Sequence, residues 1–107
     1  KDAKLIGDNL FVTNTKRLKI GIEKDCANSI TIKPSQIGSV SETINCIKMA
    51  QENSYKIIIA NRSCETCDDF IADLSVGVGA EYIKAGAISR GERICKYNRL
   101  LEIEELI

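Results

Sequence analysis

The stretch Lys56-Ile57-Ile58-Ile59-Ala60-Asn61-Arg62-Ser63 places three consecutive β-branched residues directly before a polar and charged run. An apolar run without alternation is typical of a parallel strand that is buried on both faces. The stretch therefore predicts a strand over 56–60 that ends at a polar cluster. Because parallel strands need crossover connections, usually helices, we expect the flanking sequence to alternate strands with helices.

The sequence on either side repeats this arrangement. Further strands are predicted over 4–6, 29–33 and 82–84, and polar or charged residues stand at their ends, namely Asp8, Lys33 and Lys84. Pro34 is expected to end the second strand because proline removes a ladder donor. Helices are predicted over 15–24, from Ser39 onward, over 68–76 and over 92–106. This alternation predicts an α/β fold of about four βα units, in which the carboxyl ends of the strands share one edge.

The inward faces of the helices follow from helical spacing. Ser39 and Glu42 fit a capping box at the start of the clearest helix. Its apolar stripe is predicted to consist of Val40, Ile44, Ile47 and Ala50. The corresponding inward residues are Leu18 and Ile22 in the first helix and Ile94, Tyr97 and Leu101 in the last.

Composition limits the function classes. Lys and Arg total 15 and Asp and Glu total 15, so net charge favours neither a nucleic acid nor a membrane surface as partner. No segment is long enough to span a bilayer. Five cysteines without a secretory leader favour reduced thiols and the cytosol. The chain opens at Lys1 rather than methionine, almost inside its first strand, which suggests a fragment or a processed product.

The size of the chain limits the architecture. A closed (β/α)₈ barrel takes about 250 residues, so 107 residues supply at most about half of one. Four parallel strands alone would leave two unpaired edges and an uncovered face. We therefore expect another part of the protein, or a second copy, to cover them.

The residues at the strand ends suit a small, doubly anionic phosphorylated acid. Asp8 can hold a hard divalent cation such as magnesium. Lys33 could remove a proton from a carbon next to a carboxylate if burial or nearby cations lowered its pKa. Arg62 and Ser63 suit phosphate, and Lys84 suits a second anion such as a carboxylate. As structural alternatives, Asp8 fits an ordinary turn and Ser63 a helix cap. We interpret Arg90, Glu92 and Arg93 as surface or salt-bridge residues.

Six motifs in order give the sequence a specific resemblance. GDNLFVTN at 7–14, IKPSQIG at 32–38, RSCET at 62–66, IADL at 71–74, IKAG at 83–86 and KYNRLL at 96–101 resemble the enolase family. The resemblance covers nearly the whole chain. It implies that residues 1–107 are the C-terminal part of a (β/α)₈ TIM-type barrel domain, roughly the last quarter of a full enzyme.

The resemblance also implies an activity. Enolases are lyases of glycolysis that reversibly dehydrate 2-phosphoglycerate to phosphoenolpyruvate with two magnesium ions, which implies a cytoplasmic protein. By motif, Asp8 matches a magnesium ligand and Lys33 the base. Arg62 and Ser63 match the phosphate-binding pair, and Lys84 binds the substrate carboxylate. The implied partners are the substrate, the remainder of the enolase chain and further copies in a homo-oligomer.

Three departures from the family pattern lead to alternatives. Asn61 stands at a substrate-binding position where enolases carry histidine, and Cys64 and Cys67 replace a glycine and an acidic residue. The general acid and the other metal carboxylates are absent from this sequence. We therefore expect the isolated chain to bind phosphate-type anions weakly near Arg62 without turnover. One alternative is a non-catalytic enolase-like remnant.

The cysteines suggest a second alternative. Cys64-x-x-Cys67 near a helix start resembles a thiol redox or metal-binding motif. A four-thiolate zinc site would also need Cys26, Cys46 or Cys95 to converge, and no second C-x-x-C supports that.

Overall fold

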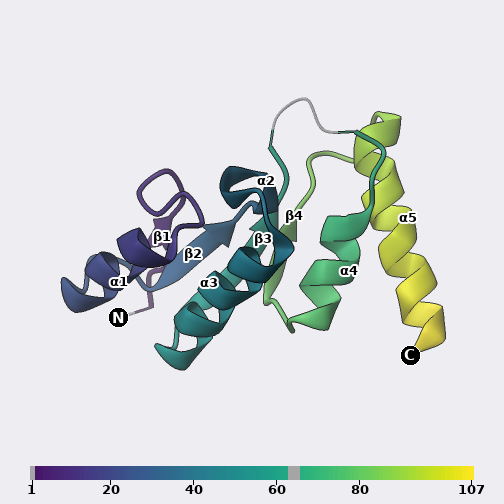
Figure 1. The fold of residues 1–107 in the computed structure, drawn as a ribbon. Coiled ribbons are helices and arrows are strands. Elements are labelled where there is room, and N and C mark those ends of the chain that lie inside the picture. The colour runs from purple at the N-terminus through teal and green to yellow at the C-terminus, as the bar shows by residue number, and fades with distance from the viewer. Residues whose placement is uncertain (1, 63–65) are drawn as a thin grey trace.

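The computed structural model describes residues 2–62 and 66–107, which form one parallel sheet with helices between the strands (Figure 1). The strands are β1 (Ile6–Gly7), β2 (Ser29–Ile32), β3 (Lys56–Ala60) and β4 (Tyr82–Lys84), paired in the order β1-β2-β3-β4. The helices are α1 (Thr15–Glu23), α2 (Pro34–Ile37), α3 (Val40–Glu52), α4 (Phe70–Gly77) and α5 (Gly91–Leu106). The predicted α/β alternation and the parallel sheet are confirmed.

One face of the sheet carries the core. Ile30 pairs with Ile57 and Ile32 with Ile59 across β2 and β3, and all four are fully buried. Figure 1 shows the helices along this side of the sheet. They contribute the buried residues Leu18, Cys46, Ile47, Ala50, Ile71 and Leu74. Burial of these apolar side chains holds the four units together, at roughly 1.5–3 kcal/mol for a fully buried large one.

The other face of the sheet is only partly covered within the described residues, since Ser29, Thr31 and Ala60 are buried there but residues of the edge strands are exposed. Ile6 is 50% exposed and Tyr82 is 44% exposed, while Ile58 is half-buried. The prediction that β3 is buried on both faces therefore holds only for the helix-covered face. The Lys4 ammonium, just before β1, lies 4.1 Å from the centroid of the Tyr82 ring on β4. Because β1 and β4 are the two edge strands, this contact shows that the sheet curves, as a barrel segment does.

Two predicted inward residues are exposed. Val40 is 49% exposed because it is the first residue of α3, and the stripe of that helix consists of Thr43, Cys46, Ile47 and Ala50. Leu101 is 60% exposed because α5 packs on α4 and makes little contact with the sheet. The predictions for these two residues were wrong, since helical spacing alone does not say which turns meet the sheet.

Helix α2 was not predicted. Pro34 ends β2 as expected, but it also begins this four-residue helix, where its fixed φ suits the first turn. Lys33 is the N-cap residue of α2, and Gly38, with φ of +86°, ends it in a left-handed conformation. The segment after Lys33 is therefore ordered by backbone geometry.

The capping prediction at α3 gives a direct stability test. Ser39 Oγ accepts a hydrogen bond from the Glu42 amide at 3.3 Å. Ser39→Ala is expected to lower the free energy of unfolding by about 1 kcal/mol, because one amide at the helix start loses its partner. Urea denaturation measures the change. Ser41→Ala, an exposed position inside the same helix, is the control and should be neutral or slightly stabilising. Equal losses in both variants would contradict the capping role.

Candidate functional site

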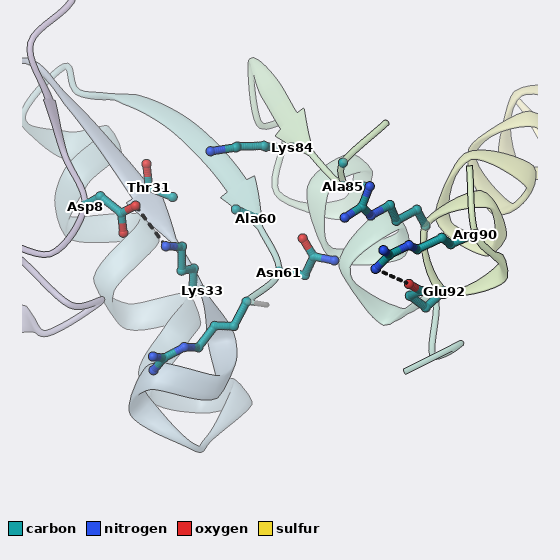
Figure 2. Close-up of a pocket in the computed structure, with 12 residues that line it drawn as sticks. Asp8, Thr31, Lys33, Ala60, Asn61, Lys84, Ala85, Arg90 and Glu92 are labelled. Atoms are coloured by element: carbon teal, nitrogen blue, oxygen red, sulfur yellow. Dashed lines mark hydrogen bonds and ion pairs between the residues drawn. The ribbon is translucent and has the colours of Figure 1, made fainter. Parts of the chain in front are cut away.

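The carboxyl ends of the four strands line one pocket of about 440 Å³, called here the strand-end pocket (Figure 2). Its lining residues are Asp8, Thr31, Lys33, Ala60, Asn61, Arg62, Lys84, Ala85, Gly86, Arg90, Glu92 and Arg93. Five of the six residues predicted from the sequence are thus brought together. The sixth, Ser63, lies outside the described residues. The topology explains the convergence, since parallel strands end on the same edge of the sheet.

Asp8 follows β1 and is held by its own turn. Its carbonyl accepts from the amides of Phe11 and Val12 at 3.1 and 3.0 Å. Its carboxylate Oδ2 accepts from Lys33 Nζ at 2.8 Å. The other oxygen, Oδ1, is buried and has no hydrogen-bond partner among the described residues. A buried carboxylate oxygen without a donor has lone pairs available for a cation.

Lys33 is fixed at its backbone as well as at its ammonium group. Its amide donates to Thr13 Oγ1 at 2.9 Å, and the same hydroxyl donates to Gln36 Oε1 at 2.9 Å. Thr13 is fully buried, so the loop after β1 and the loop after β2 share a rigid polar contact. The Lys33 side chain is 18% exposed. This lysine is thus partly desolvated and held next to Asp8.

The remaining predicted groups come from β3 and β4. Lys84 pairs with Ala60 in the sheet, and Asn61 and Arg62 follow Ala60 directly. In Figure 2, Lys84 extends toward the space beside Asp8 and Lys33, with Asn61 between that group and Arg90. The pocket therefore contains several cationic side chains, which suit a ligand with more than one anionic group.

Several residues that line the strand-end pocket were not predicted from the sequence as site residues. Arg90 and Glu92 form an ion pair at 3.9 Å, as the salt-bridge interpretation expected, yet both also line the pocket. Arg93 lines it beside Gly86. One signal in the sequence could have identified them as lining residues. They follow β4 closely, on the edge of the sheet where the other strands end. Thr31 and Ala85 are buried lining residues without a charge to mark them.

The fit of the pocket to a metal ion rests on Asp8. The orphaned Oδ1 suits one ligand position of a hard cation such as magnesium. Within 2–62 and 66–107, no group of three or more His, Cys, Asp or Glu side chains is placed to hold a metal ion. Among the described residues, Asp8 could therefore contribute one carboxylate ligand to a divalent cation.

The cysteines do not gather into a described metal site either. Cys26, Cys46, Cys67 and Cys95 are free thiols, and Cys64 lies outside the described residues. Burial raises the pKa of the Cys46 thiol to about 11, which disfavours the thiolate form that metals require. A titration of vicinal dithiols tests the redox alternative. If the titration detects no vicinal pair, the redox alternative is rejected.

Fold and pocket define the class of protein: this chain is the C-terminal part of a TIM-type barrel with a pocket at its strand ends that is lined by cationic side chains. The family description "Enolase, C-terminal TIM barrel domain" matches residues 1–107. The chain belongs to the enolase family.

Curated relatives agree with this assignment. The chain is 58% identical to enolase of Helicobacter hepaticus over 103 residues, which are 96% of this chain and 24% of that protein. It is 59% identical to enolase of Sulfurisphaera tokodaii over 98 residues, 92% of this chain and 24% of that protein. It is 56% identical to enolase of Ureaplasma parvum serovar 3 over 101 residues, 94% of this chain and 23% of that protein. The chain thus spans about a quarter of the length of these relatives.

Of the helices in the described part of the chain, none is both long enough and apolar enough to cross a bilayer.

Proposed function

We propose that this chain is the C-terminal barrel segment of a phosphopyruvate hydratase, which reversibly dehydrates 2-phosphoglycerate to phosphoenolpyruvate. The observation that carries the proposal is the convergence of Asp8, Lys33, Arg62 and Lys84 on the strand-end pocket of an enolase-family chain. These groups match the charges of the substrate, which has a phosphate, a carboxylate and a carbon-bound proton next to that carboxylate.

Each residue has a distinct part in the proposed reaction. The Lys33 amine accepts the proton from the carbon next to the carboxylate, and the electrons of that bond form the new double bond as hydroxide leaves the neighbouring carbon. Lys84 binds the substrate carboxylate and Arg62, with Ser63, binds the phosphate. The acid that protonates the leaving hydroxide is expected outside this sequence.

Magnesium is the proposed cofactor. When bound, magnesium would stabilise the negative charge that develops on the substrate carboxylate. Asp8 would supply one ligand through its free carboxylate oxygen, which supports the proposal without defining the rest of the site.

The setting of the proposed enzyme follows from its family. We place it in glycolysis and in the cytoplasm, which the odd number of cysteines, five in all, supports. Its proposed partners are the remaining enolase segments, which would cover the open sheet face, and further copies of the enzyme in a homo-oligomer.

The test is formation of phosphoenolpyruvate from 2-phosphoglycerate by the natural gene product that contains this chain. We expect turnover that is lost on chelation of divalent metal and restored by magnesium. A well-folded gene product without turnover, under the same conditions as an enolase control, would contradict the proposal and favour the non-catalytic remnant.

Asn61 gives a second prediction for the same enzyme. Asn61→His is expected to raise kcat about tenfold or more, since a hydrogen bond to a charged group is worth about 1.5–3 kcal/mol. Steady-state kinetics of the natural gene product measure the change. Asn45→His, on the exposed side of α3, is the matched control. An Asn61→His enzyme no faster than this control would show that the missing histidine does not limit turnover.

A further inference from the structure

Helix α5 has one fully buried residue, and it is a lysine. Lys96 is 0% exposed, and its Nζ donates to the carbonyl oxygens of Thr66 at 2.7 Å and Glu92 at 2.5 Å. Among the described residues, no carboxylate forms an ion pair with it. A buried ammonium group is costly unless it is hydrogen-bonded, and here two backbone carbonyl oxygens accept from it. Lys96 therefore fixes two points of the backbone to the buried side of α5.

The Thr66 carbonyl ties Lys96 to the loop after β3. Thr66 is four residues beyond Arg62, the proposed phosphate-binding group, and both precede α4. A charge-assisted hydrogen bond from a buried donor holds this point of the loop more firmly than a neutral one. Lys96 thus connects α5 to Thr66, while residues 63–65, between Arg62 and Thr66, lie outside the described part of the chain.

The next residue of α5 holds the other loop. The Tyr97 hydroxyl donates to the Gly86 carbonyl oxygen, two residues beyond Lys84. Gly86 has φ of +89°, and a Cβ there would lie 2.7 Å from Cδ of Arg93, which also belongs to α5. The loop after β4 therefore rests closely on the helix. Lys84, the proposed carboxylate-binding group, stands at the start of that loop.

We propose that Lys96 and Tyr97 are positioning residues that hold Thr66, before α4, and Gly86, after β4, on one helix and so set the spacing between Arg62 and Lys84. The inference rests on the proposed function, because it assigns this spacing to a substrate with two anionic groups. A ligand with both phosphate and carboxylate needs the two cations at a fixed separation. Inorganic phosphate needs only one of them.

The experiment compares phosphoenolpyruvate with inorganic phosphate as ligands of the natural gene product, by calorimetric titration at constant ionic strength. Lys96→Met removes the donors at similar volume, and Tyr97→Phe removes one hydroxyl. Each is expected to raise the dissociation constant of phosphoenolpyruvate about tenfold, as loss of one strong hydrogen bond would, and that of phosphate less than about twofold. Lys96→Arg retains charged donors and should recover part of the affinity.

Matched controls are Lys48→Met on α3 and Tyr55→Phe, which should leave both dissociation constants unchanged. Lys48 is exposed, and the Tyr55 hydroxyl has no hydrogen-bond partner among the described residues. Equal losses for the two ligands would indicate general destabilisation and overturn the inference, as would unchanged affinity for phosphoenolpyruvate. A wild-type protein that binds phosphoenolpyruvate no more tightly than phosphate would overturn it as well.

The two proposals fail in different ways. The Lys96 and Tyr97 variants could bind phosphoenolpyruvate more weakly and phosphate as before, while the wild type shows no turnover. That result would support the positioning role and reject the hydratase. If the wild type shows turnover but the variants weaken the binding of both ligands equally, the hydratase proposal stands and the positioning role is rejected.

Discussion

Lys33→Met is expected to lower kcat for 2-phosphoglycerate dehydration by about 10²- to 10⁴-fold, the usual contribution of a positioned general base. The substitution removes the only proposed proton acceptor of this chain. KM should change much less, because Arg62 and Lys84 would still bind the substrate anions. Steady-state kinetics of the natural gene product separate the two constants.

Two further variants separate chemistry from structure. Lys33 forms an ion pair with Asp8 at 2.8 Å, and Lys33→Arg keeps a positive charge at that place. A guanidinium does not give up its proton in proteins, so this variant cannot act as a base. The kcat of Lys33→Arg should fall nearly as far as that of Lys33→Met. Lys48→Met, at an exposed position, should retain wild-type kcat. A Lys33→Arg enzyme with near wild-type kcat would contradict the role of Lys33 as the base.

Phe11→Ala is expected to lower the free energy of unfolding by about 3–5 kcal/mol, the usual loss for a buried phenylalanine. Phe11 is 1% exposed. Its ring fills the space beside two glycines, since a Cβ would lie 2.2 Å from it at Gly7 and 2.3 Å from it at Gly21. The two glycines have no side chains to fill this space, so truncation of the ring leaves a cavity. The loss would also loosen the turn that carries Asp8.

Urea denaturation of the 107-residue chain measures this effect. Domains of this size are stable by about 5–15 kcal/mol, so Phe11→Leu is the milder companion variant, with an expected loss of about 1.5 kcal/mol or less. Phe70→Ala is the matched control, because Phe70 is the other phenylalanine and is 38% exposed. Equal losses at Phe11 and Phe70 would contradict the assignment of Phe11 to the core.

Local sequence patterns were sufficient to predict the four strands and four of the five helices of the described residues in their order. The run Ile57-Ile58-Ile59 marked β3, and the capping residue Ser39 marked the start of α3. Both signals lie within a few residues of the feature they predict. Pro34 was ambiguous, because proline ends a strand and also suits the first turn of a helix, so α2 was missed.

Burial was less predictable, because it depends on neighbours that are distant in sequence. Val40 and Leu101 have the right helical spacing, but Val40 is the first residue of α3 and Leu101 belongs to a helix that packs on α4 and not on the sheet. Lys96 shows the opposite case, because it is a charged residue and yet the fully buried residue of α5. Its ammonium group donates to two carbonyl oxygens, and no sequence pattern predicts these contacts.

The candidate site was largely predictable for a topological reason. Residues at the ends of parallel strands share an edge, so Asp8, Lys33, Arg62 and Lys84 could be expected together, and they line one pocket. The direct Asp8 to Lys33 bond and the support from Thr13 could not be foreseen, since they depend on distances of a few ångströms between separate loops. The chemical roles of these residues remain predictions.

The measurement that tests the central claim most directly is exchange of the carbon-bound proton of 2-phosphoglycerate with solvent deuterium, catalysed by the natural gene product. We expect exchange next to the carboxylate in the wild type and loss of that exchange in Lys33→Met, with phosphoenolpyruvate still bound through Arg62 and Lys84. Exchange at the wild-type rate in Lys33→Met would show that another group removes the proton and would contradict the account.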